Sequence, residues 1–142
     1  MLRIDAIAKP QSTYRTRAPG QPLRVMVVEH DEATVGALSV VVSDLGHTVC
    51  GVARTEAEAA DLALRERPDL ALLDVRLGGG DGIAAARRLN LDHGLRCIFL
   101  SGNSDHGTMA RITETYPLGV VHRPFSHAQL KVALDLAARR LR

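Results

Sequence analysis

Carboxylates, a hydroxyl and a cation stand directly after short apolar runs of this 142-residue chain. They are Glu29, His30, Asp31 and Glu32 after the first run, Asp74 after the third, Ser101 after the fourth, and His122, Arg123 and Pro124 after the fifth. If the chain brought them together, such groups could hold a hard divalent metal ion beside a phosphoryl group. The elements that precede these residues decide whether they meet.

The apolar runs have the length and near-continuous hydrophobicity of strands that are covered on both faces. We expect strands over Arg24–Val28, Thr48–Ala53, Leu70–Leu73, Cys97–Leu100 and Gly119–Val121. Helical patterns of about ten to fifteen residues separate the runs, and this alternation is typical of βα units around a parallel sheet. The sequence therefore predicts an α/β, doubly wound domain with a five-stranded parallel sheet. Ligands of such sheets bind at the carboxyl ends of the strands, where the polar residues stand.

Five helices are expected in alternation with the strands. Four apolar residues recur at helical spacing and stop at Gly46, a residue type suited to a helix end: Val35, Leu38, Val42 and Leu45. Two segments have the S/T-x-x-E/Q form of a capping box and predict the starts of the second and fifth helices: Thr55 with Glu58, and Ser126 with Gln129. The third helix is expected over Gly82–Leu91 and the fourth over about Asp105–Glu114.

Composition and charge exclude several classes of function. Hydrophobic residues make up 46% of the chain, enough for one domain with one core, but aromatic residues make up only 3% and Trp is absent. Platforms on which single-stranded nucleic acid could stack are therefore not expected. Five of the 18 basic and one of the 16 acidic groups lie in residues 1–24, so the remainder has a net charge of −2. We expect no nucleic-acid partner, because no helix carries a basic face.

Residues 1–22 are predicted to be a basic, flexible leader, and residues 23–142 the folded domain. The leader contains three of the six prolines and few apolar side chains that could be buried. Cys50 and Cys97 each lie inside an apolar run without a CxxC spacing, so we expect buried thiols in a reducing compartment. No run is long enough to span a membrane, and no signal peptide is evident. The predicted location is the cytoplasm.

From Leu23 to Arg142 the chain resembles the receiver domain of bacterial two-component response regulators. The strongest match is LALLDVRLGGGDGI, residues 70–83, in which Asp74 ends a strand and Asp81-Gly82 opens a helix. Three further matches follow the order of that family: Val27-Val28-Glu29 with Leu45-Gly46-His47, then FLSG at residues 99–102, and Arg123-Pro124-Phe125. The resemblance implies a flavodoxin-like fold with strand order 2-1-3-4-5, two helices on one face and three on the other.

For function, the resemblance implies transfer of a phosphoryl group from a histidine kinase or phosphotransfer protein onto Asp74. Ser101 would be the switch hydroxyl, and Mg²⁺ or Mn²⁺ would be held by Glu29, Asp74 and the backbone carbonyl of Arg76. Such a domain is a phosphoacceptor and not an enzyme, apart from its own phosphorylation and dephosphorylation. No output domain follows Arg142, so we expect a stand-alone receiver. It would act on a downstream protein through its fourth helix, fifth strand and fifth helix, with a homodimer as an open option.

The chain departs from the family at three positions. His30 replaces an acid that normally binds the metal, and imidazole is a poor Mg²⁺ ligand. His30 can be a metal ligand, a pH-sensitive group or a tolerated loss of the acid, and we favour the last; Asp31 can take over if the loop shifts by one residue. Arg123 replaces a lysine, which keeps the charge but makes the side chain planar and bulkier. Val120 stands where an aromatic side chain commonly completes the switch.

Two alternatives follow. A phosphorylation-independent pseudo-receiver would keep the fold as an interaction module while His30 and Arg123 weaken the chemistry. A hydrolase with an aspartyl-phosphate intermediate would also place an Asp after a strand, but such enzymes require DxD, and Asp74-Val75-Arg76 has no second acid. Metal affinity separates the receiver from the pseudo-receiver.

Overall fold

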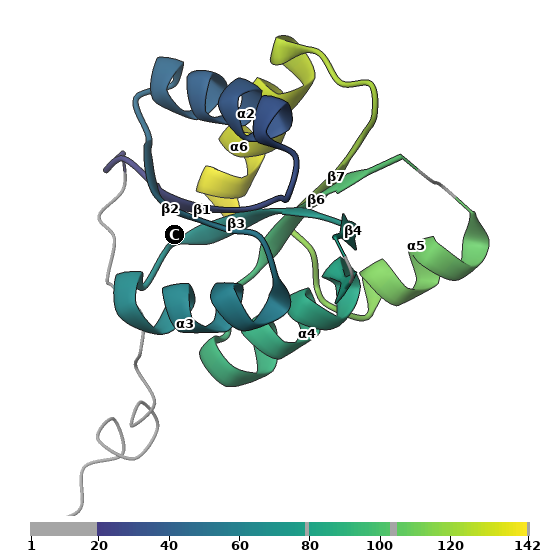
Figure 1. The fold of residues 1–142 in the computed structure, drawn as a ribbon. Helices are drawn as coiled ribbons and strands as arrows, with labels where there is room; N and C mark the ends of the chain where they lie inside the picture. The colour runs from purple at the N-terminus through teal and green to yellow at the C-terminus, as the bar shows by residue number, and fades with distance from the viewer. Residues whose placement is uncertain (1–19, 79, 103–104, 142) are drawn as a thin grey trace, which may run out of the picture.

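A five-stranded parallel sheet forms the middle layer of the protein (Figure 1). The computed structural model describes residues 20–78, 80–102 and 105–141. The strand order is β2-β1-β3-β6-β7, which confirms the predicted 2-1-3-4-5 arrangement. The strands of this sheet are β1 (Arg24–Val28), β2 (Thr48–Ala53), β3 (Leu70–Asp74), β6 (Cys97–Ser101) and β7 (Gly119–His122).

Helices cover both faces of the sheet, two on one side and three on the other (Figure 1), as expected. The helices are α2 (Glu32–Asp44), α3 (Glu56–Glu66), α4 (Gly82–His93), α5 (His106–Thr113) and α6 (His127–Arg140). Leu38 of α2 and Leu130 of α6 are buried against one face, while Leu62 of α3, Leu89 of α4 and Ile112 of α5 pack against the other. Both faces of the strands are therefore buried, which explains why their sequences are almost continuously apolar.

The helix ends largely follow the predicted signals. Gly46, just after α2, has a φ of 82°, in the left-handed region that glycine adopts without strain. At the start of α6, Ser126 and Gln129 form the reciprocal capping box. The corresponding prediction for α3 is only half right. Thr55 accepts a hydrogen bond from the Glu58 backbone, but the Glu58 carboxylate accepts from the backbone N–H of Arg54 instead of that of Thr55.

The connection between β3 and α4 contains regular structure that the sequence patterns do not predict. Two short antiparallel strands, β4 (Arg76–Leu77) and β5 (Gly80–Asp81), form a separate ladder there. Asp81 then caps α4, its Oδ1 accepting from the backbone N–H groups of Ile83 and Ala84. A pair of two-residue strands leaves no periodic pattern in a sequence, and the sequence analysis missed it.

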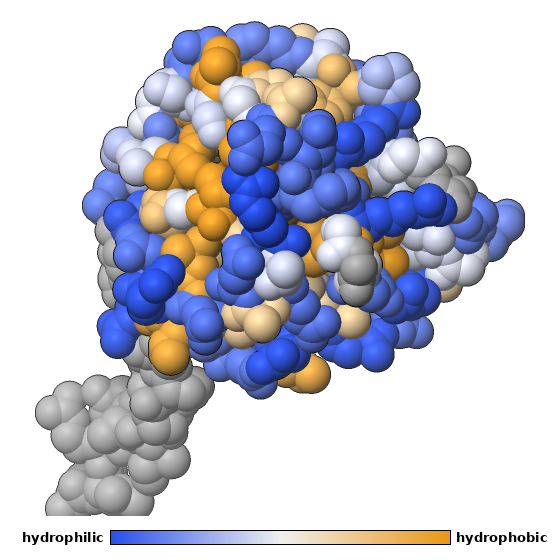
Figure 2. All heavy atoms as spheres, in the orientation of Figure 1, coloured by the Kyte–Doolittle hydropathy of each residue, from blue (hydrophilic) through white to orange (hydrophobic). Residues whose placement is uncertain are grey.

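The surface view in Figure 2 is mostly hydrophilic, with apolar residues gathered beside the β2 edge of the sheet. Val52 of β2 and Val40 of α2 are among the exposed apolar side chains. Cys97 is buried as predicted, whereas Cys50 of the edge strand is only half-buried because β2 has a neighbour on one side alone. None of the described helices is long and apolar enough to cross a membrane. Residues 1–19, most of the predicted leader, lie outside the described residues.

The start of α4 lies against the backbone that carries Asp74, and Gly82 permits this contact. A Cβ atom at Gly82 would lie 1.9 Å from the carbonyl oxygen of Asp74 and 2.8 Å from that of Val75. Gly82→Ala is therefore expected to lower the free energy of unfolding by about 3 kcal/mol, because backbone atoms cannot move aside. Urea unfolding of the purified chain measures the change.

Gly36→Ala is the matched control, because Gly36 lies inside α2 and a Cβ there meets nothing within 4 Å. It is expected to leave stability unchanged or raise it by up to about 1 kcal/mol, the difference in helix propensity. Equal effects of the two substitutions would refute the close approach at Gly82.

Candidate functional site

Three strand ends supply the side chains of the site. Glu29 directly follows β1, Asp74 is the last residue of β3, and Arg123 directly follows β7. Parallel strands end at the same edge of the sheet, so these residues meet although they are far apart in sequence. Ser101 ends β6 and is fully buried. The structure therefore confirms that these residues gather at one edge of the sheet, as predicted.

Arg123 forms ion pairs with two carboxylates at once. One guanidinium nitrogen, Nη2, lies 3.3 Å from Oε2 of Glu29 and 3.2 Å from Oδ2 of Asp74. Glu29 is fully buried and Asp74 is 8% exposed, so neither charge is well solvated by water. The cation offsets part of the cost of burying them.

Backbone donors hold the other oxygen of each carboxylate. The N–H of Asp31 donates to Oε1 of Glu29 at 3.3 Å, and the N–H of Arg76 donates to Oδ1 of Asp74 at 3.0 Å. Each carboxylate is thus fixed between one backbone donor and the guanidinium of Arg123. This arrangement orients both groups before any ligand arrives.

Burial next to a second acid changes the acidity of Glu29. The pKa of Glu29 is raised from 4.5 to about 7, chiefly by the loss of solvent and further by the hydrogen bond and negative charge of Asp74. Arg123 and the Asp31 backbone oppose this shift. Near neutral pH the Glu29 carboxyl therefore carries a proton for part of the time.

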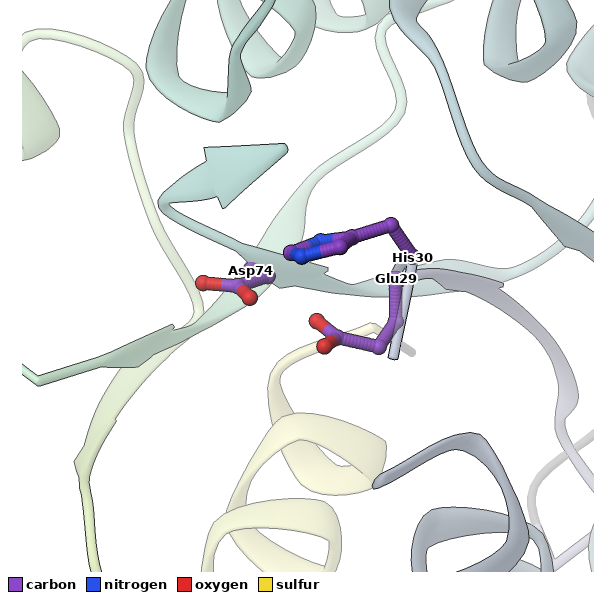
Figure 3. Close-up of side chains that lie close together, drawn as sticks. All are labelled: Glu29, His30 and Asp74. Atoms are coloured by element: carbon purple, nitrogen blue, oxygen red, sulfur yellow. The ribbon is translucent and has the colours of Figure 1, made fainter. Parts of the chain in front are cut away.

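His30 contributes its side chain to the same cluster. Figure 3 shows the imidazole of His30 and the carboxylates of Glu29 and Asp74 pointing toward one another. One ligand atom from each of the three residues lies within 4.8 Å of the others. His30, which the sequence analysis considered as one possible metal ligand, thus lies with its ring turned toward the two acids.

Asp31 does not take over as the missing acid. Its side chain is exposed and accepts hydrogen bonds from the backbone N–H and the hydroxyl of Thr34, at 3.0 and 2.6 Å. Asp31 is the N-cap of α2, a common position for aspartate because the first backbone N–H groups of a helix lack partners. The suggested shift of the loop by one residue is therefore wrong.

A cavity of about 460 Å³ opens in front of these groups. Its walls are formed by His30, Asp74, Val75, Arg76, Ser101, Gly102 and Arg123. Asp74 is reached through this cavity, although most of its surface is buried. His122, the neighbour of Arg123, is exposed and lines a different groove, between β7 and α6.

Sequence reasoning missed two arginines around the site. Arg54, after β2, donates to the carbonyl oxygen of His30 at 3.3 Å and pairs with Glu32, which ties two loops together. Arg111 of α5 pairs with the Oδ2 atom of Asp81, the capping residue of α4. Long side chains on surface helices and loops carry no sequence signal for a distant partner, so neither contact was foreseeable.

The raised pKa of Glu29 makes stability depend on pH. Between pH 4.5 and about pH 7 the Glu29 carboxyl keeps a proton in the folded chain that it releases in the unfolded chain. The folded state therefore binds more protons than the unfolded state in this window. The free energy of unfolding is therefore expected to fall as pH rises through this window, by at most about 1.4 kcal/mol per pH unit from this group. Urea unfolding between pH 4.5 and 8, in buffer with a chelator, measures the slope.

Glu29→Gln is expected to remove this component of the slope. The control Asp61→Asn, at an exposed carboxyl on α3, leaves the slope as in the wild type. Identical slopes for the wild type and Glu29→Gln would contradict the raised pKa.

Known proteins are similar to this chain in sequence and fold. Residues 25–135 match the family of the response regulator receiver domain. The transcriptional regulatory protein PdtaR of Mycobacterium tuberculosis is 30% identical over 85% of this chain and 59% of its own length. The phyllosphere-induced regulator PhyR of Methylorubrum extorquens is 28% identical over 87% of the chain and 46% of its own length. The chain thus spans about half the length of these curated relatives.

A solved structure agrees with these matches. The signal receiver domain of a modulated diguanylate cyclase from Desulfovibrio desulfuricans G20 has a TM-score of 0.78 and 30% identity, covering 85% of this chain and 97% of that domain. The strand order, the family match over most of the chain and the two relatives lead to one conclusion. The chain belongs to the receiver domain family of two-component response regulators.

Proposed function

We propose that the carboxylate of Asp74 accepts a phosphoryl group from a histidine kinase or a phosphotransfer protein. The position of Asp74 carries this proposal: it lies at the end of β3, faces the cavity and has a cation 3.2 Å from Oδ2. An Asp74 oxygen forms a bond to phosphorus while the bond from phosphorus to the donor imidazole nitrogen breaks. The nitrogen keeps the electron pair and takes up a proton. The product is an acyl phosphate.

Arg123 would reduce the repulsion between the attacking carboxylate and the incoming anion. A guanidinium can donate two parallel hydrogen bonds to phosphoryl oxygens, so Arg123 can replace the lysine of the family in charge although not in shape. Ser101 would provide the switch hydroxyl, since it lines the same cavity.

Receiver domains generally bind Mg²⁺ at an acidic site, and the oxygen atoms of this site fit a divalent cation. Glu29 and Asp74 offer carboxylate oxygens close together, and a carboxylate oxygen that accepts one hydrogen bond keeps a further lone pair. We propose that these two residues and the backbone carbonyl of Arg76 hold Mg²⁺ or Mn²⁺. When bound, the ion would neutralise negative charge on the phosphoryl oxygens.

Response regulator receivers are signalling modules, and we propose that this one acts through protein contacts and not as an enzyme. The expected surface of fourth helix, fifth strand and fifth helix corresponds to α5, β7 and α6. A groove of about 510 Å³ runs between β7 and α6, beside the exposed side chains of Val132 and Leu136. Its largely apolar lining suits a downstream protein or a second copy of the chain. Val120, which stands where the family commonly has an aromatic switch residue, also lines this groove.

A pseudo-receiver remains the second candidate because of one observation. Arg123 already contacts both carboxylates, so the site contains a cation of its own. His30 replaces an acid, so the site has one negative charge fewer to attract a metal ion. The metal ion therefore competes less well with Arg123 for the two carboxylates. In that case the unmodified domain would bind its partner directly.

We further propose that residues 23–142 form the receiver and residues 1–22 a basic leader. The family match over residues 25–135 supports this division. A cytoplasmic location stays a prediction from the sequence.

The intact mass of the chain after incubation with a small phosphodonor tests the proposal. We expect one added phosphoryl group in the presence of Mg²⁺ or Mn²⁺, because Asp74 faces the cavity and Arg123 offsets its charge. The adduct should be absent from Asp74→Asn, which removes the nucleophilic oxygen pair.

Asp31→Asn provides the matched control, since Asp31 is a nearby acid whose side chain caps α2 instead of facing the cavity. It should acquire the phosphoryl group as the wild type does. If no adduct forms with either metal, the phosphoacceptor proposal fails and the pseudo-receiver is favoured.

A further inference from the structure

The imidazole of His30 is a donor to which the proposed Mg²⁺ site gives no role. A tolerated loss of the family acid would leave the ring free to turn toward solvent, yet it faces Asp74 and Glu29 (Figure 3). The ring also lies beside the turn that follows β4, because a Cβ atom on Gly78 would be 3.5 Å from its Cδ2 atom. The His30 ring therefore lies between the two acids and the turn after β4, and it lines the cavity.

The backbone at His30 is held in place from a neighbouring loop. Arg54 donates from Nη1 to the carbonyl oxygen of His30 and forms an ion pair with Glu32, two residues further along. The preceding residue, Glu29, accepts the N–H of Asp31. The loop is thus fixed on both sides of His30, and the imidazole is presented to the acids by a constrained backbone.

Nitrogen and oxygen donors favour different cations. Mg²⁺ requires oxygen ligands in near-ideal octahedral geometry, whereas imidazole suits Co²⁺, Ni²⁺ and Zn²⁺. Exchanging an acid for a neutral imidazole removes one negative charge, which lowers the attraction for every dication. Only a transition metal regains part of that loss through a bond to nitrogen. The balance at this site therefore shifts away from Mg²⁺.

We propose that Glu29, His30 and Asp74 form a transition-metal site in which an imidazole nitrogen of His30 is a direct ligand. The inference rests on the proposed function, since it assigns the cation of the same cavity. Two buried carboxylates and one imidazole within 4.8 Å of one another form a mixed nitrogen and oxygen donor set. Arg123 shares the carboxylates from the other side, and water in the cavity would complete the coordination.

Titration of the full chain with Co²⁺ and, separately, with Mg²⁺ tests this assignment. Calorimetry gives the affinities, and the visible absorption of Co²⁺ reports whether a nitrogen ligand is bound. His30→Ala is expected to weaken Co²⁺ binding at least tenfold, to alter the Co²⁺ spectrum, and to change Mg²⁺ binding by less than twofold. His30→Asp is expected to lower the ratio of Co²⁺ to Mg²⁺ affinity at least tenfold, because it restores an oxygen ligand.

His122→Ala is the matched control, since His122 is also exposed and lies at the end of a strand, but it lines the other groove. It should leave the Co²⁺ affinity unchanged. Asp74→Asn should weaken binding of both ions, which distinguishes this cavity from metal bound to histidines elsewhere on the surface. A Co²⁺ affinity and spectrum that do not respond to His30→Ala would overturn the proposal.

Failure of this inference is distinguishable from failure of the phosphoacceptor function, because no phosphodonor is present in the titrations. A chain that binds Co²⁺ through His30 but gains no phosphoryl group keeps the metal assignment and loses the proposed function. A chain that is phosphorylated on Asp74 while its Co²⁺ binding ignores His30 gives the opposite result.

Discussion

The contact of Arg123 with Glu29 and Asp74 joins the carboxyl ends of three strands. Two buried acids lie side by side there, and without a cation their mutual repulsion and lost hydration would oppose folding. Their outer oxygens are held by backbone N–H groups, so the acids cannot turn away from each other. The guanidinium of Arg123 offsets part of this cost, and the raised pKa of Glu29 lowers it further because Glu29 is then partly neutral. Because one guanidinium offsets only part of the negative charge of the two carboxylates, the site also attracts a further cation.

The strand order determines how long the side chain at each strand end must be to reach the site. Glu29 and Asp74 lie at the ends of the neighbouring strands β1 and β3, so short side chains bring them together. β7 lies two strands from β3, a separation of about 10 Å, and only a long side chain can cross it. Arg123 meets this need, while Ser101 occupies the strand between. Gly82 completes the arrangement because it lets α4 approach the backbone of Asp74.

Much of this architecture was predictable because burial on both faces of a parallel sheet leaves a strong pattern in the sequence. The strands, the five helices and the gathering of Glu29, Asp74 and Ser101 at one edge followed from it, with the strand order supplied by the family resemblance. Side-chain partners did not follow. The direction of the His30 ring and the choice of Glu58 as partner of the Arg54 backbone depend on loops brought together only by folding.

The claim that Arg123 is the counter-charge of both acids is tested most directly by the stability of Arg123→Met at two pH values, without metal. At pH 5 Glu29 carries its proton and has no charge for Arg123 to offset, whereas at pH 8 Glu29 is ionised and needs the cation. The substitution should therefore lower the free energy of unfolding by at least about 1 kcal/mol more at pH 8 than at pH 5. Equal losses at the two pH values would contradict the account.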